Sequence, residues 1–156
     1  MITLGSATWP SSTSDSPKPL AGFVESTFSP LAAEVARRVL TGVEAPPDTA
    51  VIIVSHSGDV TSARATEAAV ASGRRPSPLL FFQAVPNAVA GYIAAQWNLT
   101  GPVVCLAPAA AGDVSDGLAL AELLIADGDA GGALIISVEQ GTKDAAHALL
   151  VKGESA

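Results

Sequence analysis

The segment His56-Ser57-Gly58-Asp59 carries residue types that acid–base chemistry uses. It directly follows TAVIIV (49–54), whose length and β-branched composition are typical of a strand. An imidazole titrates near neutral pH, so His56 beside a hydroxyl at a strand end is a candidate general base. Serine and aspartate also cap the first N–H groups of a helix, and we favour that interpretation of the segment.

A second segment, GPVVCLAPAAAGD (101–113), has the layout of an active-site corner without a nucleophile. Val103 to Ala107 has the composition of a buried strand, and at Pro108 we expect this strand to break into the start of an apolar helix. Such corners are favoured places for nucleophiles, yet this one offers only alanines at 109–111. Cys105 lies inside the predicted strand, where we expect an inert core residue.

The elements that must position these segments alternate along the chain. Apolar runs predict strands at 2–8, 49–54, 103–107, 133–139 and 145–151. Helical spacing predicts helices from Ser29-Pro30 to Gly42, over 60–73, from Pro86-Asn87 to Trp97, and from the corner to Asp127-Gly128. The run LLFFQAV (79–85) fits either a strand or a helix. The alternation predicts an α/β fold with a sheet covered on both faces.

Length and charge restrict the organisation and the partners of the chain. Its 156 residues suit one domain, 1–156, and the Ser- and Pro-rich stretch 10–22 is typical of a mobile loop. The net charge of −7 has the wrong sign for a nucleic-acid surface. No apolar run reaches the ~18 residues of a membrane span, so we expect no membrane and a cytoplasmic protein.

Cysteine and histidine are too scarce for several kinds of site. The single cysteine excludes an internal disulfide and a cysteine-rich zinc site, and the two histidines, His56 and His147, lie far apart in sequence. We therefore predict no metal and no cofactor.

The segment GLALAELLIA (117–126) has one charged residue, Glu122. A helix that is apolar nearly all round is normally buried all round. Either a second subunit or the first two helices of the same domain would cover it, and the sequence does not choose between them.

The order of these elements resembles the N-terminal half of beta-ketoacyl synthases of the thiolase fold. The run from Phe81 to Glu139 follows the frame Pro-Asn, small residues, Gly-Pro, strand, corner, apolar helix, Gly-Asp, strand. It is most similar to the beta-ketoacyl synthase-like N-terminal domain of type II polyketide and aryl-polyene pathways. Positions similar to that subgroup are Trp9, 56–59, Ser77-Pro78, Asn87-Ala88 and Gly91.

The resemblance covers about Ile2 to Val151 and implies a thiolase-like half-fold. It implies a mixed, roughly five-stranded sheet with helices on both faces and one buried apolar helix. Phe81, Phe82 and Gln83 would lie where related synthases line or gate an acyl channel, although they would also serve as core residues. From its own position before a predicted helix, Asn87 is most simply an N-cap, and Gly91 with the neighbouring alanines would let that helix approach the corner strand closely.

The resemblance also gives the corner a meaning. Active ketosynthases carry a cysteine there, at a helix start whose dipole lowers the pKa of the thiol. Aligning Gly101-Pro102 places Ala110 on that cysteine. The two family histidines belong to the C-terminal half, so the resemblance implies a shortened first half that is catalytically silent.

Two functional hypotheses follow. The first is a silent ketosynthase-like accessory subunit of a type II polyketide or fatty-acid system. Its partners would be a second copy of itself, an active ketosynthase or an acyl carrier protein. The alternative is a small enzyme or binding protein for an acyl thioester, catalysing isomerisation, dehydration or hydrolysis. In that case the N–H groups of Ala110 and Ala111 would polarise a carbonyl and His56 would be the base.

Overall fold

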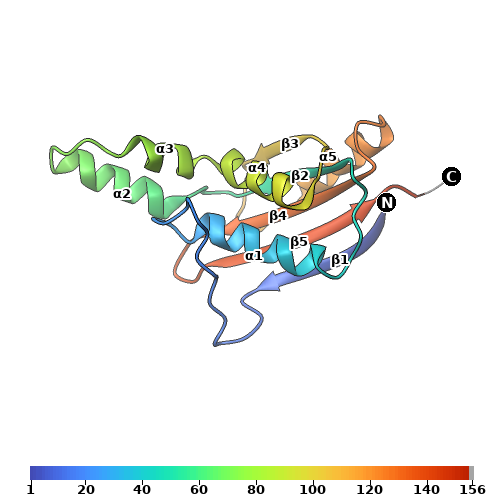
Figure 1. Ribbon diagram of the computed structural model, residues 1–156, viewed down its shortest axis with the longest axis horizontal. Helices are drawn as coiled ribbons and strands as arrows, with labels where there is room; N and C mark the ends of the chain where they lie inside the picture. Colours follow the sequence, from blue (N-terminus) through green and yellow to red (C-terminus); the bar gives the residue numbers. More distant parts are fainter. Residues whose placement is uncertain (155–156) are drawn as a thin grey trace.

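The chain folds around a mixed five-stranded sheet with the strand order β1-β5-β4-β2-β3 (Figure 1). The structure is a computed structural model and describes residues 1–154; the last two residues of the predicted domain lie outside this range. The strands are β1 (Ile2–Trp9), β2 (Thr49–Val54), β3 (Val103–Leu106), β4 (Gly132–Glu139) and β5 (Ala145–Lys152). The helices are α1 (Phe28–Leu40), α2 (Val60–Ala71), α3 (Pro78–Ala84), α4 (Pro86–Trp97) and α5 (Ser115–Ala126).

Strand direction brings three strand ends to one edge of the sheet. Strands β4, β2 and β3 are parallel, with Ile53 opposite both Ile136 and Cys105. Strand β5 is antiparallel to both of its neighbours, β4 and β1. The carboxyl ends of β2, β3 and β4 therefore meet, and the loops that follow them lie together. The predicted mixed sheet of five strands is confirmed.

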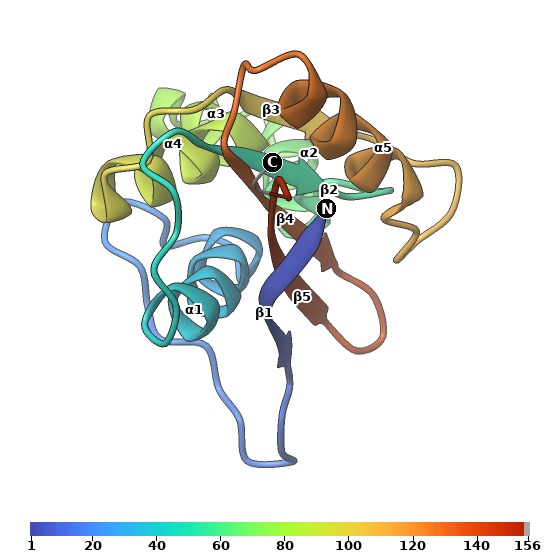
Figure 2. The same ribbon diagram turned by 90° about the vertical axis from the view of Figure 1, so that its right-hand side faces the viewer.

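Helices cover both faces of the sheet, as predicted (Figure 2). Helices α1 and α4 pack on one face, where Leu31, Val35 and Ile93 join Ile53 and Ile136 in the larger core. Helix α5 packs on the other face over Ile52, Val54 and Ile135. Strand β2 is fully buried because it lies between these two cores. Its unbroken apolar sequence thus reflects cover on both sides.

Only the side of α5 that faces the sheet is buried. Gly117 and Ala121 are the buried residues of this helix, whereas Leu123 on its outer side is 55% exposed. A Cβ atom at Gly117 would lie 2.9 Å from Val54 and 3.0 Å from Ile135, so the helix sits close against the sheet there. The prediction that this helix is buried holds for that side alone. Cover by α1 and α2 is excluded, because α1 lies on the opposite face and α2 points away from the body (Figures 1 and 2).

Helices α2 and α3 pack against each other and extend from the body as an arm, residues 60–84 (Figure 1). The ambiguous run 79–85 is helical up to Ala84, and Ser77 caps this helix by accepting a hydrogen bond from the Leu79 N–H at 3.2 Å. Within residues 1–154 no single helix is long and apolar enough to span a membrane; α3 and α4 pass that test only as a pair bent by 72°.

Several predicted details were wrong. Helix α1 begins at Phe28 with Thr27 as its N-cap, so Ser29 and Pro30 lie inside the first turn. Asn87 lies inside α4, whose N-cap is Val85. Gly91 is exposed, with no atom within 4 Å of an added Cβ, so it permits no close approach. Segment 10–22 is a loop, and its mobility stays a prediction.

Candidate functional site

The polar segment after β2 and the alanine corner after β3 meet at the shared strand edge, and Glu139 joins them. Glu139 ends β4, and its carboxylate accepts hydrogen bonds from the His56 N–H at 2.9 Å and the Gly112 N–H at 3.3 Å. A third, longer contact of 3.5 Å comes from the Ser57 hydroxyl. Sequence reasoning did not identify Glu139. The sequence feature that could have identified it is an acidic residue at the end of the predicted strand 133–139. That strand, β4, runs parallel to β2 and β3.

His56 is exposed and oriented toward the corner. Its Nδ1 lies 2.9 Å from the Pro108 carbonyl oxygen, so the ring is tied to the loop that holds the alanines. When Nδ1 carries the proton and donates it to that oxygen, Nε2 keeps its lone pair and is able to accept a proton. The structure thus brings His56 and the corner together. The role of His56 as a base stays a prediction.

Asp59 is a structural residue. Its buried carboxylate accepts hydrogen bonds from the Ser62 N–H at 2.9 Å, the Ser62 hydroxyl at 2.8 Å and the Ser26 hydroxyl at 2.6 Å. The first of these bonds makes Asp59 the N-cap of α2. The capping interpretation is therefore confirmed for this residue, which fixes the base of the arm to the segment before α1.

The corner itself is a loop rather than the start of a helix. Ala109, Ala110 and Ala111 are exposed, and α5 begins only at Ser115. Gly112 adopts a φ of 75°, which favours glycine, and Asp113 accepts a hydrogen bond from the Ser115 N–H at 2.9 Å. Because of this turn, α5 begins at Ser115 and not at Pro108, where the sequence predicted its start. The N–H groups of Ala110 and Ala111 therefore lie outside the first turn of α5, and their role toward a carbonyl stays a prediction.

Cys105 is not the buried core residue that we expected. It lies on the edge strand β3, is exposed, and its thiol is 3.0 Å from the Asn87 amide oxygen on α4. Partial burial raises the pKa of the Cys105 thiol, which lowers its thiolate fraction at neutral pH. A hollow of about 290 Å³ is lined by Cys105, His56 and Pro86 among others, without any of the corner alanines.

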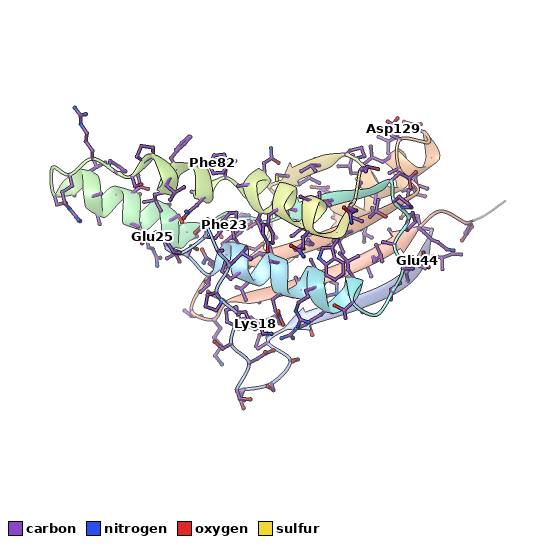
Figure 3. The ribbon with its side chains drawn as sticks, viewed as in Figure 1. Lys18, Phe23, Glu25, Glu44, Phe82 and Asp129 are labelled. Carbon is purple, nitrogen blue, oxygen red and sulfur yellow. The ribbon has the colours of Figure 1, made fainter. Side chains whose placement is uncertain are left out.

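The three acyl-channel candidates separate into two environments. Phe81 and Phe82 are 76% and 66% exposed, so the alternative that they fill the core is wrong. Figure 3 shows Phe82 on the arm. Gln83 is buried at the base of the arm, near Asp59 and Ser62. The structure does not bring these three residues to the alanine corner within one chain.

Replacing Glu139 by alanine is expected to loosen both loops at this edge. The His56 and Gly112 N–H groups lose their common acceptor, and a lost hydrogen bond to a charged group costs about 1.5–3 kcal/mol, less where water replaces it. Hydrogen exchange should therefore be faster at His56 and Gly112. Glu139→Gln keeps an acceptor oxygen and should retain most of the protection. Unchanged exchange in Glu139→Ala would show that the carboxylate does not order the corner.

Comparison with known proteins places the fold. No protein-family model matches the chain, and no curated protein is significantly similar to it in sequence. A solved ketosynthase in complex with its chain length factor, from Xenorhabdus doucetiae, matches with a TM-score of 0.75 at 19% identity, covering 91% of this chain and 65% of that one.

Two further solved structures match the same fold. The ishigamide ketosynthase/chain length factor matches with a TM-score of 0.70 at 20% identity, over 88% of this chain and 47% of that chain. A type II polyketide synthase acyl carrier protein in complex with its ketosynthase matches with a TM-score of 0.60 at 14% identity, over 81% and 47%. The chain thus has the fold of a thiolase-like ketosynthase half-domain, and it spans 47–65% of the length of these chains.

Proposed function

We propose that this chain, whose fold is that of a ketosynthase half-domain, is a catalytically silent accessory subunit of a type II polyketide or fatty-acid system. It acts by associating with an active ketosynthase. Two of the similar structures are ketosynthases with a chain length factor, which supports a heteromeric role. The observation that carries the proposal is the combination of an alanine corner with uncovered apolar surface on the arm and on α5.

The corner supports silence because alanine offers no nucleophile. An acyl-enzyme route needs an activated thiol or hydroxyl, and residues 109–111 provide neither. Cys105 does not replace it, since its thiol contacts Asn87 on α4 and its raised pKa disfavours the thiolate. The corner loop is nevertheless tied to β4, because the Gly112 N–H donates to the Glu139 carboxylate at 3.3 Å.

The uncovered surface supports association. On the arm, Leu79, Phe81 and Phe82 are 57%, 76% and 66% exposed, and on α5 Leu123 is 55% exposed. Single exposed apolar residues are ordinary, but adjacent large ones typically mark interaction sites. Aromatic residues are also enriched in protein interfaces. We assign the arm to the contact with the ketosynthase.

An acyl carrier protein is the second partner in this proposal, because one similar structure holds a carrier protein bound to its ketosynthase. In this proposal the carrier protein binds the heteromer of this chain and the ketosynthase. The proposal does not require the carrier protein to bind this chain in isolation.

Coexpression with a type II ketosynthase of the same organism tests the proposal. Native mass spectrometry should show a stable heteromer, and the purified chain alone should not condense acyl and malonyl groups on a carrier protein. A chain that stays monomeric beside the ketosynthase and its carrier protein would contradict the accessory role. Condensation by the chain alone would contradict its silence.

A further inference from the structure

A second hollow lies on the sheet face opposite α5, between α1, α4 and segment 10–22. Its volume is about 460 Å³, within the usual range of about 300–1,000 Å³ for small-molecule pockets. None of its lining residues belongs to the segments 55–59 or 107–114. Its lining includes Lys18, Leu20, Glu34, Arg37, Tyr92 and Trp97. We call this hollow the α1–α4 cleft.

The walls of the cleft are mainly apolar. Leu20 and Trp97 contribute aliphatic and aromatic surface, and Tyr92 adds a second ring, whereas Ile93 is 1% exposed and contributes almost none. Such a wall favours a ligand with an apolar body, since binding removes apolar area from water.

The charged groups at the cleft favour an anion. The Glu34 carboxylate is already occupied: Arg37 donates to it at 2.9 and 3.0 Å, and Arg38 at 2.9 Å. These bonds, chiefly those from Arg37, lower the pKa of Glu34, and the positive charges of the two arginines offset the charge of its carboxylate.

Two cationic donors are left for a ligand. Arg37 uses Nε and Nη2 for Glu34, and its Nη1 has no partner among residues 1–154. Lys18 takes part in none of the ion pairs found in that range. Both cations therefore offer N–H groups at the cleft, in a chain whose net charge is −7.

The loop wall of the cleft is attached to both helices. Asp15 accepts two hydrogen bonds from Arg38 of α1, at 2.8 and 2.9 Å. Phe23 packs edge-on against Tyr92 of α4, with ring centroids 6.2 Å apart, and its N–H donates to the Leu20 carbonyl at 3.0 Å. Figure 3 shows Lys18 on this segment and Phe23 just after it, both near α1. The backbone on either side of Lys18 is thus attached to the two helices.

We propose that the α1–α4 cleft binds an amphipathic carboxylate, an unbranched apolar chain that ends in one carboxyl group. The chain lies along Leu20, Tyr92 and Trp97, and the carboxylate meets Lys18 and Arg37. This site is separate from the alanine corner and does not depend on association with a ketosynthase.

Decanoate, used below its micellar concentration, is the probe that tests the site. Trp97 lines the cleft, and the chain has only one other tryptophan, Trp9, so a Trp9→Phe protein reports on the cleft by fluorescence. We expect a saturable change with decanoate and at least tenfold weaker binding of 1-decanol and of decyltrimethylammonium. Calorimetric titration of the unmodified chain supplies the same constant if Trp9→Phe does not fold.

Charge reversal at one residue separates a built site from general hydrophobic binding. Lys18 is exposed, so Lys18→Glu should leave the fold intact and weaken decanoate binding at least tenfold, whereas Lys18→Arg should bind as the unmodified chain does. The proposal is overturned if the folded chain shows no saturable binding, if decanol binds as tightly as decanoate, or if Lys18→Glu leaves the affinity unchanged.

Discussion

Gly101→Ala is expected to destabilise the fold by about 3 kcal/mol or more, because the added methyl group meets backbone atoms. An ideal Cβ at Gly101 would lie 2.5 Å from the Thr49 carbonyl carbon and 2.6 Å from the Ala50 nitrogen, and it would also contact the Asp48 carbonyl oxygen. Side chains can rotate away from such a clash. The backbone at the start of β2 cannot, because it is fixed between β3 and β4.

Gly91→Ala is the matched control for this prediction. Nothing lies within 4 Å of a Cβ at Gly91, which is exposed in the middle of α4. Alanine there should stabilise the chain by about 0.5–1 kcal/mol, the usual gain over glycine in a helix interior. Urea denaturation of both proteins measures the difference. A Gly101→Ala protein within 1 kcal/mol of the unmodified chain would show that β2 shifts to admit the methyl group.

The strands were predictable because the apolar pattern is strong where a strand is covered on both faces. The runs AVIIV (50–54) and ALII (133–136) are unbroken apolar segments, and the strands that contain them, β2 and β4, each have a neighbour on both sides in the sheet. Pattern does not say which strand lies at an edge, however. Cys105 was therefore expected in the core, although β3 has a neighbour on one side only.

Helix starts were harder to predict because several residues near each start are suitable caps. Around α1, Thr27 and Ser29 are both reasonable N-caps, and tertiary hydrogen bonds favour the earlier one: the Thr27 hydroxyl donates to Asp144 and accepts from Gln140. These partners are more than 110 residues away in sequence. No local pattern contains that information.

The site was predictable in part. Segments 55–59 and 107–114 both follow parallel strands, so their proximity follows from the topology. Their attachment through Glu139 depends on β4 lying beside β2, an arrangement that the order of elements alone does not determine. The exposure of Phe81 and Phe82 could not be predicted from the sequence either. A run of apolar residues has the same composition whether it lies in a core or on an exposed surface.

That exposure leads to the second large effect. If the chain associates with a ketosynthase through the arm, as we propose, replacing both Phe81 and Phe82 by glutamate is expected to weaken that association at least a hundredfold. The stability of the chain should stay nearly unchanged. Truncating a buried aromatic anchor at an interface typically costs 2 kcal/mol or more, and two buried charges add a desolvation cost. In the isolated chain the same rings are 76% and 66% exposed, so their removal has little effect on folding.

Val24→Glu is the control for charge alone, because Val24 is 77% exposed on the segment between β1 and α1, outside the arm. Sedimentation of each variant with the ketosynthase gives the affinity, and thermal unfolding gives the stability.

Equal affinity of the arm variant and the unmodified chain for the ketosynthase would show that the arm does not belong to the interface. The outer side of α5, where Leu123 is 55% exposed, would then be the next surface to test, by Leu123→Glu in the same assay. Weaker association of the arm variant without any loss of stability would instead show that Phe81 and Phe82 serve the interface, whereas the buried apolar residues stabilise the fold.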